Sequence, residues 1–239
     1  MYKRVLLKLS GEALKDETNQ MILDATCIEG LVKMVKELHD NGVEVAIVIG
    51  AGNVWRGKLA STIGIEPVPA DFMGMLGTVI NAVAMSSSLK NHGVDSVVYS
   101  AVPAIEGVTL PYDKDDADKS LSQGKVCFLA GGTGKPFFTT DTAAALRAVE
   151  LSCSAIFMGK NGVDGIYTAD PDHDPNAEFI KTISFTEIIK RKLQVMDLSA
   201  VELIKDTNIE VRVFSMAEPS NFLKVAAGED IGTTVKKGE

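Results

Sequence analysis

Short runs of apolar, often β-branched residues alternate with helix-like stretches along the whole chain, and this alternation limits the fold more than any other feature of the sequence. The apolar runs cover residues 3–9, 43–50, 95–100, 125–130, 154–159 and 210–214, and helices are expected near residues 25–41, 71–92, 114–122, 140–152, 184–193, 198–207 and 220–227. Continuous apolar strands are typical of a parallel sheet that helices cover on both faces. The sequence therefore predicts an α/β fold, a three-layer αβα sandwich around a mainly parallel sheet.

Length and charge limit the organisation and the partners. A chain of 239 residues with 46% hydrophobic residues can form one large α/β domain, with two smaller domains as the alternative. We see no repeat or linker and expect a single domain, residues 1–239. The net charge of −8 argues against a nucleic-acid partner, because a phosphate backbone calls for a basic face.

The sequence also favours a cytoplasmic location without a membrane span. The longest apolar run, VAIVIGAG, is well short of the ~20 residues that a span needs, and the N-terminus enters a strand-like pattern in place of a signal peptide. Cys27, Cys127 and Cys153 lie far apart and form no C-x-x-C pair, which indicates buried thiols in a reducing compartment.

The stretch AGGTGKPFFTTD, residues 130–141, has the glycine-lysine pair of a phosphate loop but does not match one. The P-loop pattern, aligned on Gly134 and Lys135, requires glycine at position 129 and a hydroxyl residue at position 136. The chain has Leu129 and Pro136 there. Because proline has no N–H to offer a phosphate and no hydroxyl to offer magnesium, phosphates must be held elsewhere.

Ligands of parallel sheets collect at the carboxyl ends of the strands, so the loops that follow the strands are the candidate site. In the first, LLKLSGEAL, Lys8 lies among leucines near a strand end and is followed by Ser10 and Gly11. Such a lysine either extends to solvent or is placed there for function.

The second loop, VIGAGNVWRG, has a G-x-G after a strand, as a dinucleotide-binding loop would. Trp55 occupies the position of the third glycine, and so bulky a side chain would block the close approach of helix and strand. These residues fit better a glycine loop in which a phosphate contacts bare N–H groups and an arginine lies beside it. The alternative is an ordinary turn with a surface arginine. The residues concerned are Gly50, Gly52, Asn53 and Arg56.

Two later loops each allow a structural and a functional interpretation. Asp141 either caps a helix or lies beside magnesium or a lysine at the phosphates. In residues 158–175, turn sequences indicate a hairpin, yet Tyr167 beside Asn161 and Asp170 could equally surround a nucleoside.

Taken together, the chain resembles a known family. The segments LLKLSGEAL, VIGAGNVWRG, ADFMGMLGTVINA, AGGTGKPFFTTDTAA, GVDGIYTADP and LQVMDLSA occur in the order and spacing of the bacterial-type UMP kinases (uridylate kinases) of the amino acid kinase superfamily. The resemblance covers nearly the whole chain and implies an αβα sandwich without a P-loop. It further implies transfer of the γ-phosphoryl group from ATP to UMP, giving ADP and UDP in pyrimidine nucleotide biosynthesis, with Mg²⁺ held mainly by the nucleotide phosphates.

The resemblance also implies roles for single residues, with UMP bound mainly by the N-terminal part and ATP mainly by the part from about residue 155. Catalytic roles are implied for Lys8, Arg56, Asp141 and Asp197. The ATP site comprises Lys8, Leu9, Ser10, Gly11, Gly52, Arg56, Asn161, Tyr167 and Asp170, and the UMP site comprises Ala51, Asp71, Thr133, Gly134, Lys135, Pro136, Phe137, Phe138, Thr139 and Thr140. No residue is assigned directly to the metal.

The chain departs from the family pattern in three places. Ala51 stands where the family usually has glycine, and Lys135 where it usually has asparagine. Residues 15–24 lack the glycine that is associated with activation by GTP, which argues against GTP control. The resemblance further implies inhibition by UTP and a homohexamer of paired dimers. Another small-molecule kinase of the superfamily and a non-catalytic nucleotide-binding regulator are the alternative functions.

Overall fold

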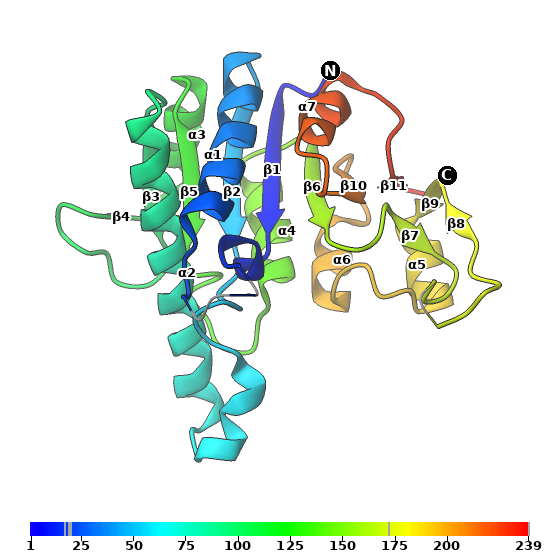
Figure 1. Ribbon diagram of the computed structural model, residues 1–239, viewed down its shortest axis with the longest axis horizontal. Helices are drawn as coiled ribbons and strands as arrows, with labels where there is room; N and C mark the ends of the chain where they lie inside the picture. Colours follow the sequence, from blue (N-terminus) through cyan, green and yellow to red (C-terminus); the bar gives the residue numbers. More distant parts are fainter. Residues whose placement is uncertain (17, 19–20, 172, 239) are drawn as a thin grey trace.

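A nine-stranded sheet runs through the centre of the protein (Figure 1). The computed structural model describes residues 1–16, 18, 21–171 and 173–238. All neighbouring strands of the sheet are parallel except β10 and β11. In sheet order the strands are β4 (Leu110–Pro111), β3 (Ser96–Ser100), β5 (Val126–Ala130), β2 (Glu44–Ile49), β1 (Arg4–Leu9), β6 (Ala155–Lys160), β10 (Glu210–Ser215), β11 (Thr233–Lys236) and β9 (Thr182–Ser184).

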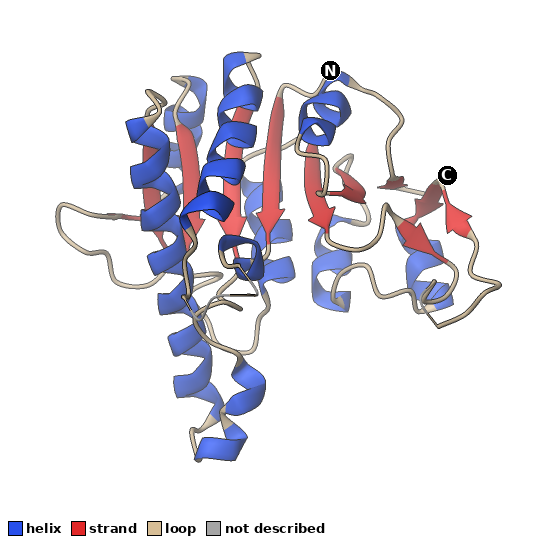
Figure 2. Cartoon of the chain, viewed as in Figure 1, coloured by secondary structure: helices blue, strands red, loops and turns tan. Residues whose placement is uncertain are grey.

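Helices cover both faces of this sheet, as Figure 2 shows. One face packs against α1 (Ala25–Asp40), α2 (Pro67–Asn91) and α7 (Ser220–Ala227), and the other against α3 (Lys114–Ser122), α4 (Thr140–Glu150), α5 (Phe185–Arg191) and α6 (Leu198–Ile204). The predicted αβα sandwich with a mainly parallel sheet is therefore confirmed. Short elements complete the chain: η1 (Gly11–Leu14), η2 (Gly57–Leu59), η3 (Ser61–Ile63) and a hairpin of β7 (Ile166–Tyr167) and β8 (Phe179–Ile180).

The central strand β1 is buried on both sides. Val5, Leu7 and Leu9 pack in the core beneath α1, whereas Leu6 packs in the core beneath α4. Because side chains alternate between the faces of a strand, Lys8 lies on the α4 side at the carboxyl end of β1. The fold thus brings this lysine to the edge where the loops of the central strands converge.

The predicted elements differ from the observed ones mainly at the ends and the sheet edges. Helix α2 begins at Pro67, four residues before the predicted start, because proline is tolerated in the first helical turn, where its missing N–H would be unpaired anyway. Strands β4, β9 and β11 were not predicted. Each is only two to four residues long, too short to show a period.

Among the described residues, α2 is the one helix whose length and composition would allow it to cross a membrane. It packs against β3, β5 and α1, and 44% of its most apolar window is buried inside the protein. Val68, Phe72, Leu76 and Ile80, spaced four residues apart, form an exposed stripe along its outer side, which we call the α2 stripe. A core helix needs only one apolar face, so the stripe is an apolar surface that the chain itself does not cover.

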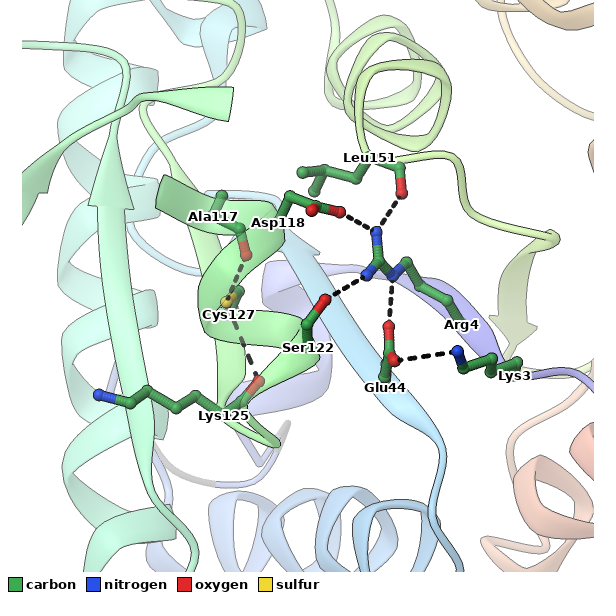
Figure 3. Close-up of polar contacts among 9 residues, drawn as sticks. All are labelled: Lys3, Arg4, Glu44, Ala117, Asp118, Ser122, Lys125, Cys127 and Leu151. Carbon is green, nitrogen blue, oxygen red and sulfur yellow. Dashed lines mark hydrogen bonds and ion pairs between the residues drawn. The ribbon is translucent and has the colours of Figure 1, made fainter. Parts of the chain in front are cut away.

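At the amino ends of the strands, Arg4 ties four elements together (Figure 3). Its Nε donates to Glu44 on β2, and its terminal nitrogens donate to Asp118 and Ser122 on α3 and to the carbonyl of Leu151 after α4. The Arg4 side chain is 13% exposed and that of Glu44 16%. Removal of the guanidinium would leave a largely buried carboxylate and a carbonyl without their partner.

We expect Arg4→Met to lower the free energy of unfolding by about 3 kcal/mol, because it breaks a largely buried charge pair from one side. The matched control is Lys3→Met. Lys3 approaches the same Glu44 at 3.9 Å but its side chain is 86% exposed, so its loss should cost less than about 1 kcal/mol. Urea unfolding measures both, and equal losses would show that Arg4 has no special structural role.

Candidate active site

An ion pair between two neighbouring elements lies at the carboxyl ends of the central strands. The Nζ atom of Lys8 is 2.8 Å from Oδ1 of Asp141, and both side chains are about one-fifth exposed. Asp141 lies in the first turn of α4, where Thr139 caps the helix by accepting from the N–H groups of Asp141 and Thr142. The carboxylate therefore has two favourable neighbours, a lysine and a helix N-terminus.

A second lysine on the same face was not predicted. Lys160 ends β6, the strand beside β1, and its side chain points to the α4 face because Lys8 pairs with Met158 two residues earlier. Burial lowers the pKa of Lys160, and the charge of Lys8 lowers it further, whereas Asp141 opposes both effects. The signal was present, since a lysine follows an apolar strand as in LLKL, but the predicted strand ended at residue 159.

The loop after β2 offers bare backbone donors. Gly50 N–H donates to the carbonyl of Leu9, but no acceptor among the described residues pairs with the N–H groups of Ala51, Gly52 and Asn53. Gly11 packs directly on this loop, because a Cβ there would lie 2.5 Å from the carbonyl oxygen of Gly50. Adjacent free N–H groups are a site for an anion.

Arg56, at the end of the same loop, forms an ion pair with a partly exposed carboxylate. Its side chain is 61% exposed, and its Nη2 lies 2.7 Å from Oε1 of Glu12. Glu12 also binds Lys15, and although burial would raise the pKa of Glu12, the bond from Lys15 and the charge of Arg56 lower it overall. Arg56 lines none of the three cavities described below, and an anion at this loop would have to compete with Glu12 for its guanidinium.

A cavity of about 290 Å³ lies beneath this loop and receives most of the residues predicted for UMP. Its lining includes Ala51, Gly52, Asp71, Thr133, Phe138, Thr139 and Thr140. Four predicted residues do not line it: Gly134, Lys135, Pro136 and Phe137.

Asp71 serves a second purpose in this structure. One of its oxygens accepts from the N–H of Phe137 at 2.6 Å, and Phe137 adopts a left-handed backbone conformation with φ of 69°. The carboxylate therefore joins the start of α2 to residues 131–139 across the mouth of the cavity.

Two further cavities have volumes of about 700 and 540 Å³, and the larger one borders the first turn of α4 at Asp141. The larger one is lined by Asp141 and Asp197, and both are lined by Lys160 and residues 192–195. Tyr167 and Asp170 line the smaller one, as the prediction of a nucleoside site requires. Asn161 is exposed and lines neither cavity.

Asp197 lies near Asp141 but has structural partners. It caps α6 by accepting from the N–H of Ala200 at 2.8 Å, and it accepts from the hydroxyls of Thr139 and Thr142. These contacts tie α6 to the N-terminus of α4, so Asp197 supports the Lys8–Asp141 pair and does not bond to the lysine itself.

The remaining predicted ATP residues follow β1. The Leu9 side chain is 1% exposed in the core and its carbonyl accepts from Gly50, so its side chain is out of reach of a nucleotide. Ser10 is exposed and caps η1.

The residues present suit magnesium held by a nucleotide. The described part of the chain has no group of three acidic, histidine or cysteine residues that could hold a metal by itself. Asp141 offers a carboxylate beside two cavities, and Mg²⁺ in phosphoryl transfer is typically bound by one or two carboxylates together with phosphates.

Two cavities meet at the first turn of α4, which carries Asp141, and two lysines from the neighbouring strands β1 and β6 lie on the same face of a mainly parallel sheet. Cations and free backbone N–H groups at strand-end loops are features that suit a phosphoryl-transfer enzyme. The chain belongs to the amino acid kinase family, which it matches over residues 3–215.

Solved structures agree with this assignment. The UMP kinase from Bacillus anthracis is 36% identical, with a TM-score of 0.96 and coverage of 100% of this chain and 97% of that chain. The UMP kinase from Ureaplasma parvum is 34% identical, with a TM-score of 0.92 and coverage of 99% and 100%. Uridylate kinase from Archaeoglobus fulgidus is 27% identical, with a TM-score of 0.73 and coverage of 98% and 100%.

Proposed function

We propose that this protein is a UMP kinase, which transfers the γ-phosphoryl group of ATP to UMP and yields ADP and UDP for pyrimidine nucleotide biosynthesis. The observation that carries the proposal is the Lys8–Asp141 pair, because the turn that carries Asp141 borders both the cavity of about 290 Å³, through Thr140, and the cavity of about 700 Å³. The similarity of the whole chain to two UMP kinases at 36% and 34% identity supports UMP as the acceptor.

The proposed mechanism rests on bringing two anions into line. The N–H groups of Ala51, Gly52 and Asn53 would bind the phosphates where donor and acceptor meet, while Lys8 and Lys160 neutralise the oxygens of the transferring group. Asp141 keeps the Lys8 ammonium in place. No general base is required, because the phosphate of UMP is already an anionic nucleophile.

Magnesium would enter with ATP. Asp141 is the residue best placed to contact it, and the ion would supply charge neutralisation between the donor's phosphates. We propose that UMP lies in the N-terminal cavity with its ribose near Asp71, and ATP in the part from about residue 155 with its nucleoside near Tyr167 and Asp170.

Regulation and location follow from the family and the sequence. We expect UTP to inhibit and GTP not to activate. Residues 17, 19 and 20, part of the segment on which the GTP prediction depends, lie outside the described residues. A cytoplasmic location suits the three free cysteines, since burial raises the pKa of the Cys127 and Cys153 thiols to about 12 and keeps them unreactive.

We further propose that the protein is a homohexamer of paired dimers and that the α2 stripe is one of its interfaces. The stripe spans three helical turns of exposed apolar side chains, with Leu76 55% and Ile80 45% exposed. A second copy crossing it would bury these residues at no cost in polar groups.

Substitution of Lys8 tests the proposed function most directly. We expect Lys8→Met to lower kcat for UDP formation by about 100-fold or more, because it removes a charge from the transferring phosphoryl group. Lys36→Met, which removes an exposed lysine on α1 that pairs only with Asp40, is the control. A coupled ADP-release assay with UMP, CMP, aspartate and carbamate should show turnover with UMP. If the wild-type protein instead turned over only aspartate or carbamate, it would have a different kinase activity.

The lowered pKa of Lys160 predicts a pH effect. Lys160 assists as an ammonium, so kcat/KM should be full at low pH and fall as the pH rises through its pKa, earlier than an ordinary lysine would allow. Lys160→Arg stays charged and should move this decline to higher pH, whereas Lys160→Met should be slow throughout. An unchanged alkaline decline in Lys160→Arg would exclude Lys160 as its source.

The interface proposal predicts a change in assembly. Leu76→Asp should produce smaller species in sedimentation velocity, because it places a charge in an apolar contact. Leu203→Asp makes the same change at a 40% exposed position on α6, away from the stripe, and should leave the sedimentation coefficient unchanged. A wild-type coefficient for Leu76→Asp would remove the stripe from the interface.

A further inference from the structure

Two buried asparagines form a reciprocal pair between α2 and the loop after β2, residues 50–56, which we call the phosphate loop. Asn53, in the loop after β2, donates to Oδ1 of Asn81 at 2.9 Å, and Asn81, on α2, donates back to Oδ1 of Asn53 at 2.8 Å. Asn81 is fully buried and Asn53 is 8% exposed. Two amides facing each other in this way satisfy an acceptor and a donor on each side.

The second N–H of each amide reaches a different backbone carbonyl. Asn81 donates to Gly50 at 2.8 Å, and Asn53 donates to Ile22 at 2.7 Å. All four amide hydrogens are therefore used, and Asn81 of α2 holds the loop at two points, Gly50 and Asn53. No side chain other than asparagine or glutamine offers two donors and an acceptor in one plane.

The same loop is also fixed by close packing on α2. A Cβ at Gly77, one turn before Asn81, would lie 2.9 Å from the Cβ of Ala51, so the helix touches the loop there. From the other side, a Cβ at Gly11 would lie 2.5 Å from Oδ1 of Asn53. The pair thus lies where the lysine segment, the phosphate loop and α2 meet.

We propose that Asn81 and Asn53 are positioning residues, which aim the free N–H groups of Ala51, Gly52 and Asn53 at the phosphates. The inference rests on the proposed function and extends it to residues that touch no substrate through their side chains. Residues 50–56 belong to no helix or strand, so their direction depends on these contacts. A loop whose donors are already aligned loses less entropy when phosphates bind.

The test compares two losses of a buried polar contact on the same helix. Asn81→Ala removes the hydrogen bonds from α2 to Gly50 and Asn53. Ser86 lies farther along α2, and Ser86→Ala removes its side-chain hydrogen bond to Ser96 on β3, outside the loop. We expect Asn81→Ala to lower kcat/KM for UMP by about 100-fold, as a displaced reacting group can, at temperatures where it is fully folded. Ser86→Ala should keep wild-type kinetics although both variants melt at lower temperature.

Hydrogen exchange provides a measurement that does not depend on turnover. In wild type and Ser86→Ala, inorganic triphosphate should slow exchange of the amides at residues 51–53, and in Asn81→Ala this protection should be lost. Asn53→Ala, in the loop itself, should give the same result and serves if Asn81→Ala does not fold.

The outcomes separate the two proposals. Wild-type kinetics and protection in folded Asn81→Ala would overturn the positioning role and leave the UMP kinase proposal standing. Equal kinetic losses in Ser86→Ala would also overturn it, because the effect would then be general destabilisation. If wild type failed to phosphorylate UMP while triphosphate protection still required Asn81, the proposed function would fall and the loop would remain a positioned phosphate site.

Discussion

The organisation of the candidate site depends on placing two lysine side chains close together at the carboxyl edge of a sheet while their mutual repulsion is offset. Lys8 and Lys160 lie at the carboxyl ends of neighbouring strands on the same face, and burial together with the charge of Lys8 lowers the pKa of Lys160. Asp141 resolves the conflict, since its carboxylate lies 2.8 Å from one lysine and favours the charged form of the other. Asp197 then holds the turn that carries Asp141. The two aspartates thus allow two lysines to lie together at this edge of the sheet.

Much of the fold was predictable because its strands are strongly patterned. The six apolar runs became the six central strands, since continuous burial on both faces leaves a plain signal in the sequence. The edges escaped prediction for the opposite reason. Strands such as β4 and β11 depend on pairing with a neighbouring strand more than on their own residues. Helix α2 can begin at Pro67 because the first N–H groups of a helix have no partner within the helix, so the missing N–H of proline costs nothing there.

The site was predictable where function requires unusual residue types, and not where it requires support. Lysine in an apolar strand and glycines after one are exceptional, so Lys8 and the glycine loop after β2 stood out as candidates, and the structure places both at the carboxyl edge of the sheet. Asn81 did not, because an asparagine inside a long helix gives no sign of its distant partner. The bond between Asp71 and Phe137 is likewise invisible in the sequence, since it joins residues 66 positions apart through a backbone N–H.

The order of the strands has a consequence for synthesis of the chain. Among the strands of this sheet, β1 is synthesised before the others, and it lies in the middle of the finished sheet, between β2 and β6. When residues 1–130 have emerged, five strands can already pair, and β1 forms one of the two edges of this partial sheet, an apolar edge whose hydrogen-bonding groups on the side of β6 are open. Until β6 arrives, the nascent chain therefore presents a template for wrong pairing, a reason for cells to shield this intermediate from aggregation.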